Sequence, residues 1–127
     1  MTNQEVFDIS VNHLRKQGRK SSAGKKADDI TGIVTDDCRY RLKDGDTILM
    51  CAAGPFIPDE VYNEKMEGKG PWGLKYKKVY EFPGINVEFL GGLQEIHDGC
   101  EVAEWESEWE EFAKKNNVVY TPPTLSE

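Results

Sequence analysis

Cysteine, histidine and aspartate together can form a thiol triad, and this chain offers Cys51, His97 and Asp98. A thiol becomes nucleophilic when a base or a helix N-terminus lowers its pKa, and Cys51 lies shortly before an expected helix at Pro58. Two features oppose catalysis. Cysteine on an apolar face packs as a small hydrophobic residue, and Asp98 would point to a different face of a helix from His97. The sequence therefore favours a non-enzymatic protein, with these three residues as its catalytic candidates.

Cys38, Cys51, Cys100 and His97 could also bind zinc, since three cysteines and one histidine are a known ligand set. The chain has neither C-x2-C nor H-x3-H spacing, so we expect no metal site and no cofactor. The odd count of 3 cysteines does not suggest a secreted disulfide scaffold.

Negative charge is concentrated in one segment of the chain. Residues 98–111 hold seven acids and no lysine or arginine, and they carry the whole net charge of −7 because the remaining charges balance. Four of these acids are the predicted partner-binding residues: Glu101, Glu104, Glu108 and Glu111. Such a face suits a basic protein and repels a phosphate backbone, so we expect no direct nucleic-acid binding. A solvated face, or a face that imitates nucleic acid, is the alternative.

A basic stretch near the N-terminus is the second candidate binding site. Arg15, Arg19 and Lys20, with the loop that follows, could hold the phosphates of a small ligand such as a nucleotide signal. The stretch has no G-x-x-x-x-G-K-[ST] motif, and such residues are also common at a solvated helix end.

Helical spacing sets the elements that position these residues. Thr2 and Glu5 form a capping box, and Gly18 suits the end of the helix that they begin. A second apolar stripe runs over residues 87–99, and its Gly91-Gly92 pair predicts that another element packs closely there.

Trp105, Trp109 and Phe112 recur at positions i, i+4 and i+7 and predict a final helix with an acidic first turn. At this spacing the tryptophans favour the core, with an interface anchor as the alternative. We also expect a short helix from Pro58, a loop at the GKGPWG segment and a short strand at residues 118–120, whereas residues 74–82 fit a strand or a helical turn.

The Asp44-Gly45 pair predicts a tight hairpin turn between alternating flanks. A two-residue loop at these positions pairs Lys43 with Asp46 and, further out, Cys38 with Cys51. That register would put the two sulfurs on one apolar face and permit a disulfide, which a reducing cytosol disfavours.

The length of 127 residues predicts a single domain over 1–127, with a mobile loop at 20–30 and a loose tail at 121–127. No window approaches the roughly 20 apolar residues of a membrane helix. The N-terminal segment lacks a signal-peptide pattern. We therefore expect a cytoplasmic protein without membrane contact.

Several motifs resemble a family of small uncharacterised proteins from bacteriophages, prophages and some bacteria. They are Cys38-x-Tyr40, Cys51-Ala-x-Gly54, Phe56-Ile-Pro-Asp-Glu60 and Phe89-Leu-x-x-Leu-Gln-x-Ile-His-Asp98. The resemblance spans most of the chain and departs from the family pattern at residues 22–36 and 69–84. It implies a shared fold and a phage-associated setting, and it implies no reaction.

These observations predict an α+β fold with a small antiparallel sheet, the hairpin of about residues 37–52, packed against three to four helices. The predicted function is that of a phage-type accessory protein in the host cytoplasm. It would bind a host protein, such as a basic or nucleic-acid-binding component of a defence system, through the acidic helix. The alternatives are a small-ligand binding sponge and a cysteine–histidine hydrolase.

Overall fold

Helices and two short hairpins make up the computed structural model, which describes residues 1–27 and 29–123. Within these residues the helices are α1 (Asn3–Gln17), α2 (Pro71–Tyr76), α3 (Val87–Gly99) and α4 (Trp105–Lys115). The strands are β1 (Ser22–Ala27), β2 (Val34–Cys38), β3 (Leu42–Asp44) and β4 (Thr47–Leu49), and 3-10 turns cover Gly54–Phe56, Glu64–Met66 and Val102–Glu104. The predicted α+β class is confirmed, with the antiparallel strands divided between two small sheets.

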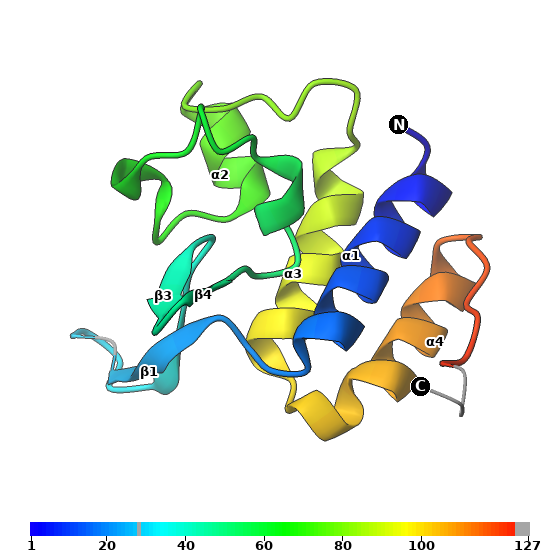
Figure 1. Cartoon of the computed structure of the whole chain (residues 1–127), viewed down its shortest axis with the longest axis horizontal. Coiled ribbons are helices and arrows are strands. Elements are labelled where there is room, and N and C mark those ends of the chain that lie inside the picture. Colours follow the sequence, from blue (N-terminus) through cyan, green and yellow to red (C-terminus); the bar gives the residue numbers. More distant parts are fainter. Residues whose placement is uncertain (28, 124–127) are drawn as a thin grey trace.

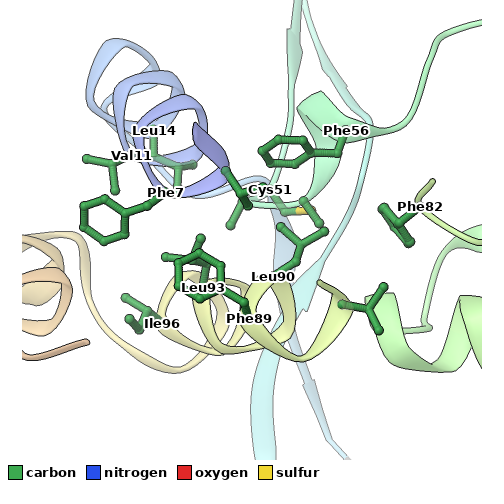
Figure 2. Packing of buried hydrophobic residues seen from close by; sticks show 14 of the residues in the cluster. Phe7, Val11, Leu14, Cys51, Phe56, Phe82, Phe89, Leu90, Leu93 and Ile96 are labelled. Atoms are coloured by element: carbon green, nitrogen blue, oxygen red, sulfur yellow. The ribbon is translucent and has the colours of Figure 1, made fainter. Parts of the chain in front are cut away.

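Helix α3 occupies the centre of the fold, where α1, α2 and α4 all pack against it (Figure 1). Its buried residues Phe89, Leu90 and Leu93 meet Phe7 and Leu14 of α1 in one apolar cluster (Figure 2). Burying one side chain of this size contributes roughly 1.5–3 kcal/mol. This cluster therefore holds together helices that lie far apart in the sequence.

Helix α1 begins and ends at the predicted residues. The N–H of Glu5 donates to the Thr2 hydroxyl (3.1 Å), and the N–H of Thr2 donates to the Glu5 carboxylate (2.8 Å). At the other end Gly18 adopts a left-handed conformation (φ 71°), and its N–H donates to the carbonyl oxygen of Leu14. The predicted capping box and glycine stop are confirmed.

The glycine pair of α3 marks the approach of α4. A Cβ atom added to Gly92 would lie 2.5 Å from a ring carbon of Phe112, whereas a Cβ added to Gly91 would meet nothing within 4 Å. The close packing predicted at this pair is therefore confirmed at Gly92.

The β3–β4 hairpin has a different register from the predicted one. Asp44 pairs with Thr47, so Gly45 and Asp46 form the turn in place of Asp44 and Gly45. Gly45 adopts the left-handed conformation (φ 62°) at the first turn position. Hairpin loops that require positive φ at this position select glycine there, which shifts the pairing of β4 by two residues.

The predicted opposition of Cys38 and Cys51 is wrong. The β3–β4 ladder ends at Leu42 and Leu49, and Cys38 pairs with Ser22 in the other sheet. Both cysteines are thiols, and the register argument for a disulfide between them no longer holds.

A strand occupies most of the segment predicted as a mobile loop. β1 pairs antiparallel with β2, with an irregularity between Ser22 and Lys25. Ser21 anchors its start, because the N–H of Arg39 donates to the Ser21 carbonyl (2.9 Å) and the Ser21 hydroxyl donates to the Arg39 carbonyl (2.7 Å). The segment is polar and lacks alternation, so main-chain pairing forms this strand without an apolar pattern. Residue 28 of the predicted loop lies outside the described residues.

Turns replace the helix predicted from Pro58. The N–H of Tyr62 donates to the Pro58 carbonyl (3.0 Å), but the turn is not continued. The Arg41 guanidinium donates to the carbonyl oxygens of Gly54 (2.9 Å) and Ile57 (2.5 Å). A side chain from a distant segment therefore fixes the backbone before Pro58 as a tight turn.

Helix α2 begins at Pro71, inside the GKGPWG segment predicted as a loop. The predicted strand at residues 118–120 is also wrong, because these residues have no regular structure. The Gln4 side chain instead donates to the Val119 carbonyl (3.0 Å) and accepts from the Val119 N–H (2.7 Å), as a neighbouring strand would. Of the predicted tail 121–127, residues 124–127 lie outside the described residues. No helix in the described part of the chain has the length and apolar character needed to cross a membrane.

Candidate functional site

A pocket of about 210 Å³ brings together several chemically functional side chains. It lies between β2, the loop at residues 68–70 and α3, and its lining includes Cys38, Cys51, Gln94 and Asp98. This volume is below the roughly 300 Å³ at which pockets for drug-sized ligands begin. The pocket is the place to test the predicted triad and the predicted zinc ligands.

Both ring nitrogens of His97 are engaged by groups other than Cys51. The N–H of Ser21 donates to Nε2 (3.1 Å), so Nε2 carries no proton, and the proton on Nδ1 is donated to Asp98 Oδ1 (2.8 Å). A histidine acting as general base would direct its unprotonated nitrogen at the nucleophile. In this chain a backbone N–H occupies that place, so His97 fastens the start of β1 to α3.

Asp98 does not point away from His97, as predicted for neighbours on a helix. Its Oδ1 accepts from His97 Nδ1 and from Gln94 Nε2 (2.8 Å), and Gln94 Oε1 accepts from the N–H of Ala53 (3.0 Å). This chain of hydrogen bonds satisfies the buried His97 and Gln94 and ties α3 to the segment after Cys51. Sequence reasoning did not single out Gln94, although its i, i+4 spacing to Asp98 was visible in the L-Q-x-I-H-D motif.

Cys51 packs in the core as predicted, 1% exposed and close to Phe56 and Leu90 (Figure 2). Burial raises the pKa of its thiol to about 12, and hydrogen bonds from the backbone of Ala53 and Gly54 offset only part of that rise. Thiolate is the nucleophilic form of cysteine, so Cys51 is essentially inactive as a nucleophile at neutral pH.

Among the described residues, Cys38, His97 and Asp98 form the group that could hold a metal ion, with one ligand atom of each lying within 4.8 Å of the others. The hydrogen bonds of His97 do not fit a role as metal ligand. Binding through Nδ1 would move the proton to Nε2, where it would face the N–H of Ser21. Cys38 and Asp98 alone leave fewer ligands than the three or four that zinc takes from proteins. Within the described residues the Cys3His set is not assembled, because the group of mutually close ligand atoms includes neither Cys51 nor Cys100.

The predicted partner-binding glutamates lie on the outside of the molecule. Glu101, Glu104, Glu108 and Glu111 are all exposed. Glu101 and Glu104 cap the 3-10 turn before α4, where the N–H of Glu101 donates to Glu104 Oε1 (3.0 Å). Glu108 and Glu111 form no ion pair within the described residues.

One acid of α4 faces inward. Glu106 accepts two hydrogen bonds from Arg15, at 2.9 Å from Nε and 2.7 Å from Nη2, and a third from the Tyr120 hydroxyl (2.7 Å). Burial alone would raise the pKa of Glu106, but these hydrogen bonds together outweigh it and lower the pKa. The pKa of Arg15 is raised correspondingly, chiefly by its hydrogen bonds to Glu106. This pair joins α1 to α4.

The structure does not bring the predicted ligand-binding residues to one pocket. Arg15 is committed to Glu106 and to the Thr121 carbonyl (2.8 Å). Arg19 forms an exposed ion pair with Asp44 (2.6 Å), and the Lys20 ammonium lies 3.5 Å from the Asp98 carbonyl oxygen. Each side chain has a different protein partner.

No protein-family model, curated protein or solved structure matches the chain. Its function therefore has to be inferred from its own residues and their geometry.

Proposed function

We propose that the chain is a non-enzymatic binding protein whose acidic helix face docks on a basic surface of another protein. The acidic face consists of Glu101 and Glu104 at the 3-10 turn before α4, and of Glu108 and Glu111, whose spacing of three residues puts them on one side of α4. Their exposure, without intramolecular cations at Glu108 and Glu111 in the described part of the chain, is the observation that carries the proposal.

The buried side of α4 holds the acidic face in a fixed position. Trp105 and Trp109 are 2% and 1% exposed, and Ala113 completes the buried stripe. With both tryptophans in the core, recognition through this helix is electrostatic. An acidic surface of this kind raises the association rate of a basic partner and makes that rate depend on salt.

The resemblance to phage-associated proteins suggests the setting. A host protein with a basic, nucleic-acid-binding surface is the partner that the charge of the acidic face fits, and blocking such a surface in a defence system is one action that this binding would perform. In this setting the chain would act in the host cytoplasm. The alternative functions have less support, since Arg15, Arg19 and Lys20 each contact a different protein group and Cys51 is buried with a raised thiol pKa.

The test compares wild-type protein with a Glu104→Gln, Glu108→Gln, Glu111→Gln variant in quantitative pull-downs from bacterial lysate, followed by measurement of affinity for each protein recovered. A glutamine side chain at position 104 keeps the oxygen that caps the turn. The matched control neutralises three other exposed acids, Glu60, Glu64 and Glu81.

We expect a basic partner that binds the wild type and the control equally and loses about tenfold or more in affinity for the face variant, mainly through slower association. The affinity of the wild type should fall with rising salt. Recovery of no partner, or of partners that bind the face variant as well as the wild type, would contradict the proposal.

A further inference from the structure

Helix α2 carries an aromatic pair on the surface of the protein. Trp72 is 57% exposed and Tyr76 is 71% exposed, and their rings stack with centroids 5.0 Å apart and planes 8° from parallel. The core side of this helix is supplied by Pro71 and Leu74, which are buried. Large aromatic side chains are on average well buried, and exposed ones that gather together are typical of binding surfaces.

Lysines lie close to this pair in the sequence, without intervening acids. Residues 68–80 contain four lysines and no aspartate or glutamate. Lys75, Lys77 and Lys78 are exposed and Lys69 is half-buried. None of the four forms an ion pair within the described residues, although the Lys69 ammonium donates to the Lys65 carbonyl (2.9 Å). Helix α2 and the residues next to it thus combine exposed rings with lysines that no ion pair neutralises within the described residues.

We propose that this aromatic–lysine surface, formed by Trp72, Tyr76 and the lysines at 69, 75, 77 and 78, binds single-stranded nucleic acid. An unpaired base can stack on an outer ring face and extend the Trp72–Tyr76 stack, because every base has a π-face. The lysines attract the phosphates that flank the base, and the release of counterions from these phosphates favours binding. A duplex hides its base faces in its own stack and offers only phosphates to the lysines.

An anionic membrane is the competing partner for a surface of aromatics and lysines. Apart from the two rings, the apolar area that this segment could put into a membrane is small. Pro71 and Leu74 are buried, and Val79 is only 38% exposed. The stacked rings also cover one face of each other. The geometry therefore favours base stacking over membrane insertion.

The net charge of −7 disfavours nucleic-acid binding only at the part of the surface that carries the excess of acids. The acid excess belongs to residues 98–111, and α2 and α4 lie on opposite sides of α3 (Figure 1). Fields from exposed charges decay over about 10 Å at ordinary ionic strength. The acidic face would repel phosphates from α4 and leave α2 accessible, so this inference is independent of the proposed function.

The test measures fluorescence anisotropy of a labelled oligo-dT, about 15 nucleotides long, with the full chain at about 50 mM salt. Trp72→Ala should weaken binding at least about tenfold, and Trp72→Phe, which keeps a ring, should restore most of it. A Lys75→Gln, Lys77→Gln variant should lower the salt dependence of log K, whose slope is about −0.7 per phosphate neutralised. The matched control, Lys114→Gln with Lys115→Gln on α4, should bind as the wild type does.

Three outcomes would overturn the inference. The first is no binding of oligo-dT by the wild type at this salt. The second is binding that Trp72→Ala leaves unchanged. The third is Trp72-dependent binding to vesicles of anionic lipid that exceeds binding to oligo-dT. Trp72 is exposed, so Trp72→Ala should keep the circular dichroism spectrum and unfolding midpoint of the wild type, which separates lost binding from lost fold.

Discussion

Helices α2 and α4 carry the same aromatic spacing and use it in opposite ways. Trp105 and Trp109 on α4 are four positions apart and lie in the core, whereas Trp72 and Tyr76 on α2 have the same spacing and are exposed to solvent. The rings of α4 are tilted by 37°, and Trp105 also stacks on His97, so they pack against several elements. The rings of α2 contact each other in parallel.

The apolar residues between the aromatics explain this difference. In α4 the other residues of the first two turns are acids and a serine, so the tryptophans are the residues that can enter the core. In α2 Pro71 and Leu74 form a competing apolar side, and they are the ones buried. An i, i+4 aromatic pair therefore predicts a helix, and its neighbours decide which side of the helix faces inward.

The difference between the two helices is tested most directly by truncating one aromatic side chain in each. Trp109→Ala should lower the free energy of unfolding by about 3–5 kcal/mol, because it removes a large buried side chain and leaves a cavity. Trp72→Ala should change it by less than about 0.5 kcal/mol. Urea unfolding at room temperature measures both.

If Trp109→Ala fails to fold, Trp109→Phe provides the second measurement and should still cost more than Trp72→Ala. Equal losses at the two positions would show that the exposed pair of α2 contributes to folding, and the distinction between a core helix and a binding helix would be wrong.

A second comparison concerns the packing that holds α4 against α3. Gly92→Ala places a Cβ 2.5 Å from the Phe112 ring and should cost about 1–3 kcal/mol through overpacking. Gly91→Ala meets nothing and should gain about 0.5–1 kcal/mol from helix propensity and reduced chain entropy. Unfolding in urea should therefore give opposite signs for adjacent residues of one helix. The same sign at both positions would contradict the close approach of α4 at Gly92.

Local sequence signals predicted the main helices and the inward side of α4. These signals are the Thr2 cap, the Gly18 stop and the Trp105–Trp109 spacing. Each depends on residues only a few positions apart, so it can be recognised in a single sequence. The inward packing of Cys51 was also predicted and is confirmed, although the prediction used a hairpin register that the structure does not have.

Contacts between distant residues account for what could not be predicted. Nothing near Pro58 shows that Arg41 will fix the preceding carbonyls, and nothing near His97 shows that the N–H of Ser21 will occupy its Nε2. The strand β1 likewise depends on a partner and not on its own pattern. The exposure of Trp72 and Tyr76 was not predicted, because it depends on which side of α2 packs against the core.

The smallest expected effect on stability comes from neutralising Glu106, which bonds to α1, in comparison with the exposed Glu108. Glu106→Gln should destabilise the protein by about 1 kcal/mol at pH 7, since it weakens charged hydrogen bonds from Arg15 and Tyr120 at a site partly open to solvent. Glu108→Gln should change stability by less than about 0.5 kcal/mol, because Glu108 has no ion pair within the described residues.

The pH dependence of this difference has a definite sign. The pKa of Glu106 in the folded protein is below its ordinary value of 4.5, so the unfolded chain binds a proton at higher pH than the folded one. The stabilisation is therefore fully present above pH 4.5 and is lost as the pH falls through the lower pKa of the folded state. Thermal unfolding between about pH 3 and pH 7 should show the gap between wild type and Glu106→Gln closing in acid. A gap that persists unchanged to the acid end would mean that Arg15 and Tyr120 hold position 106 by packing and not by its charge.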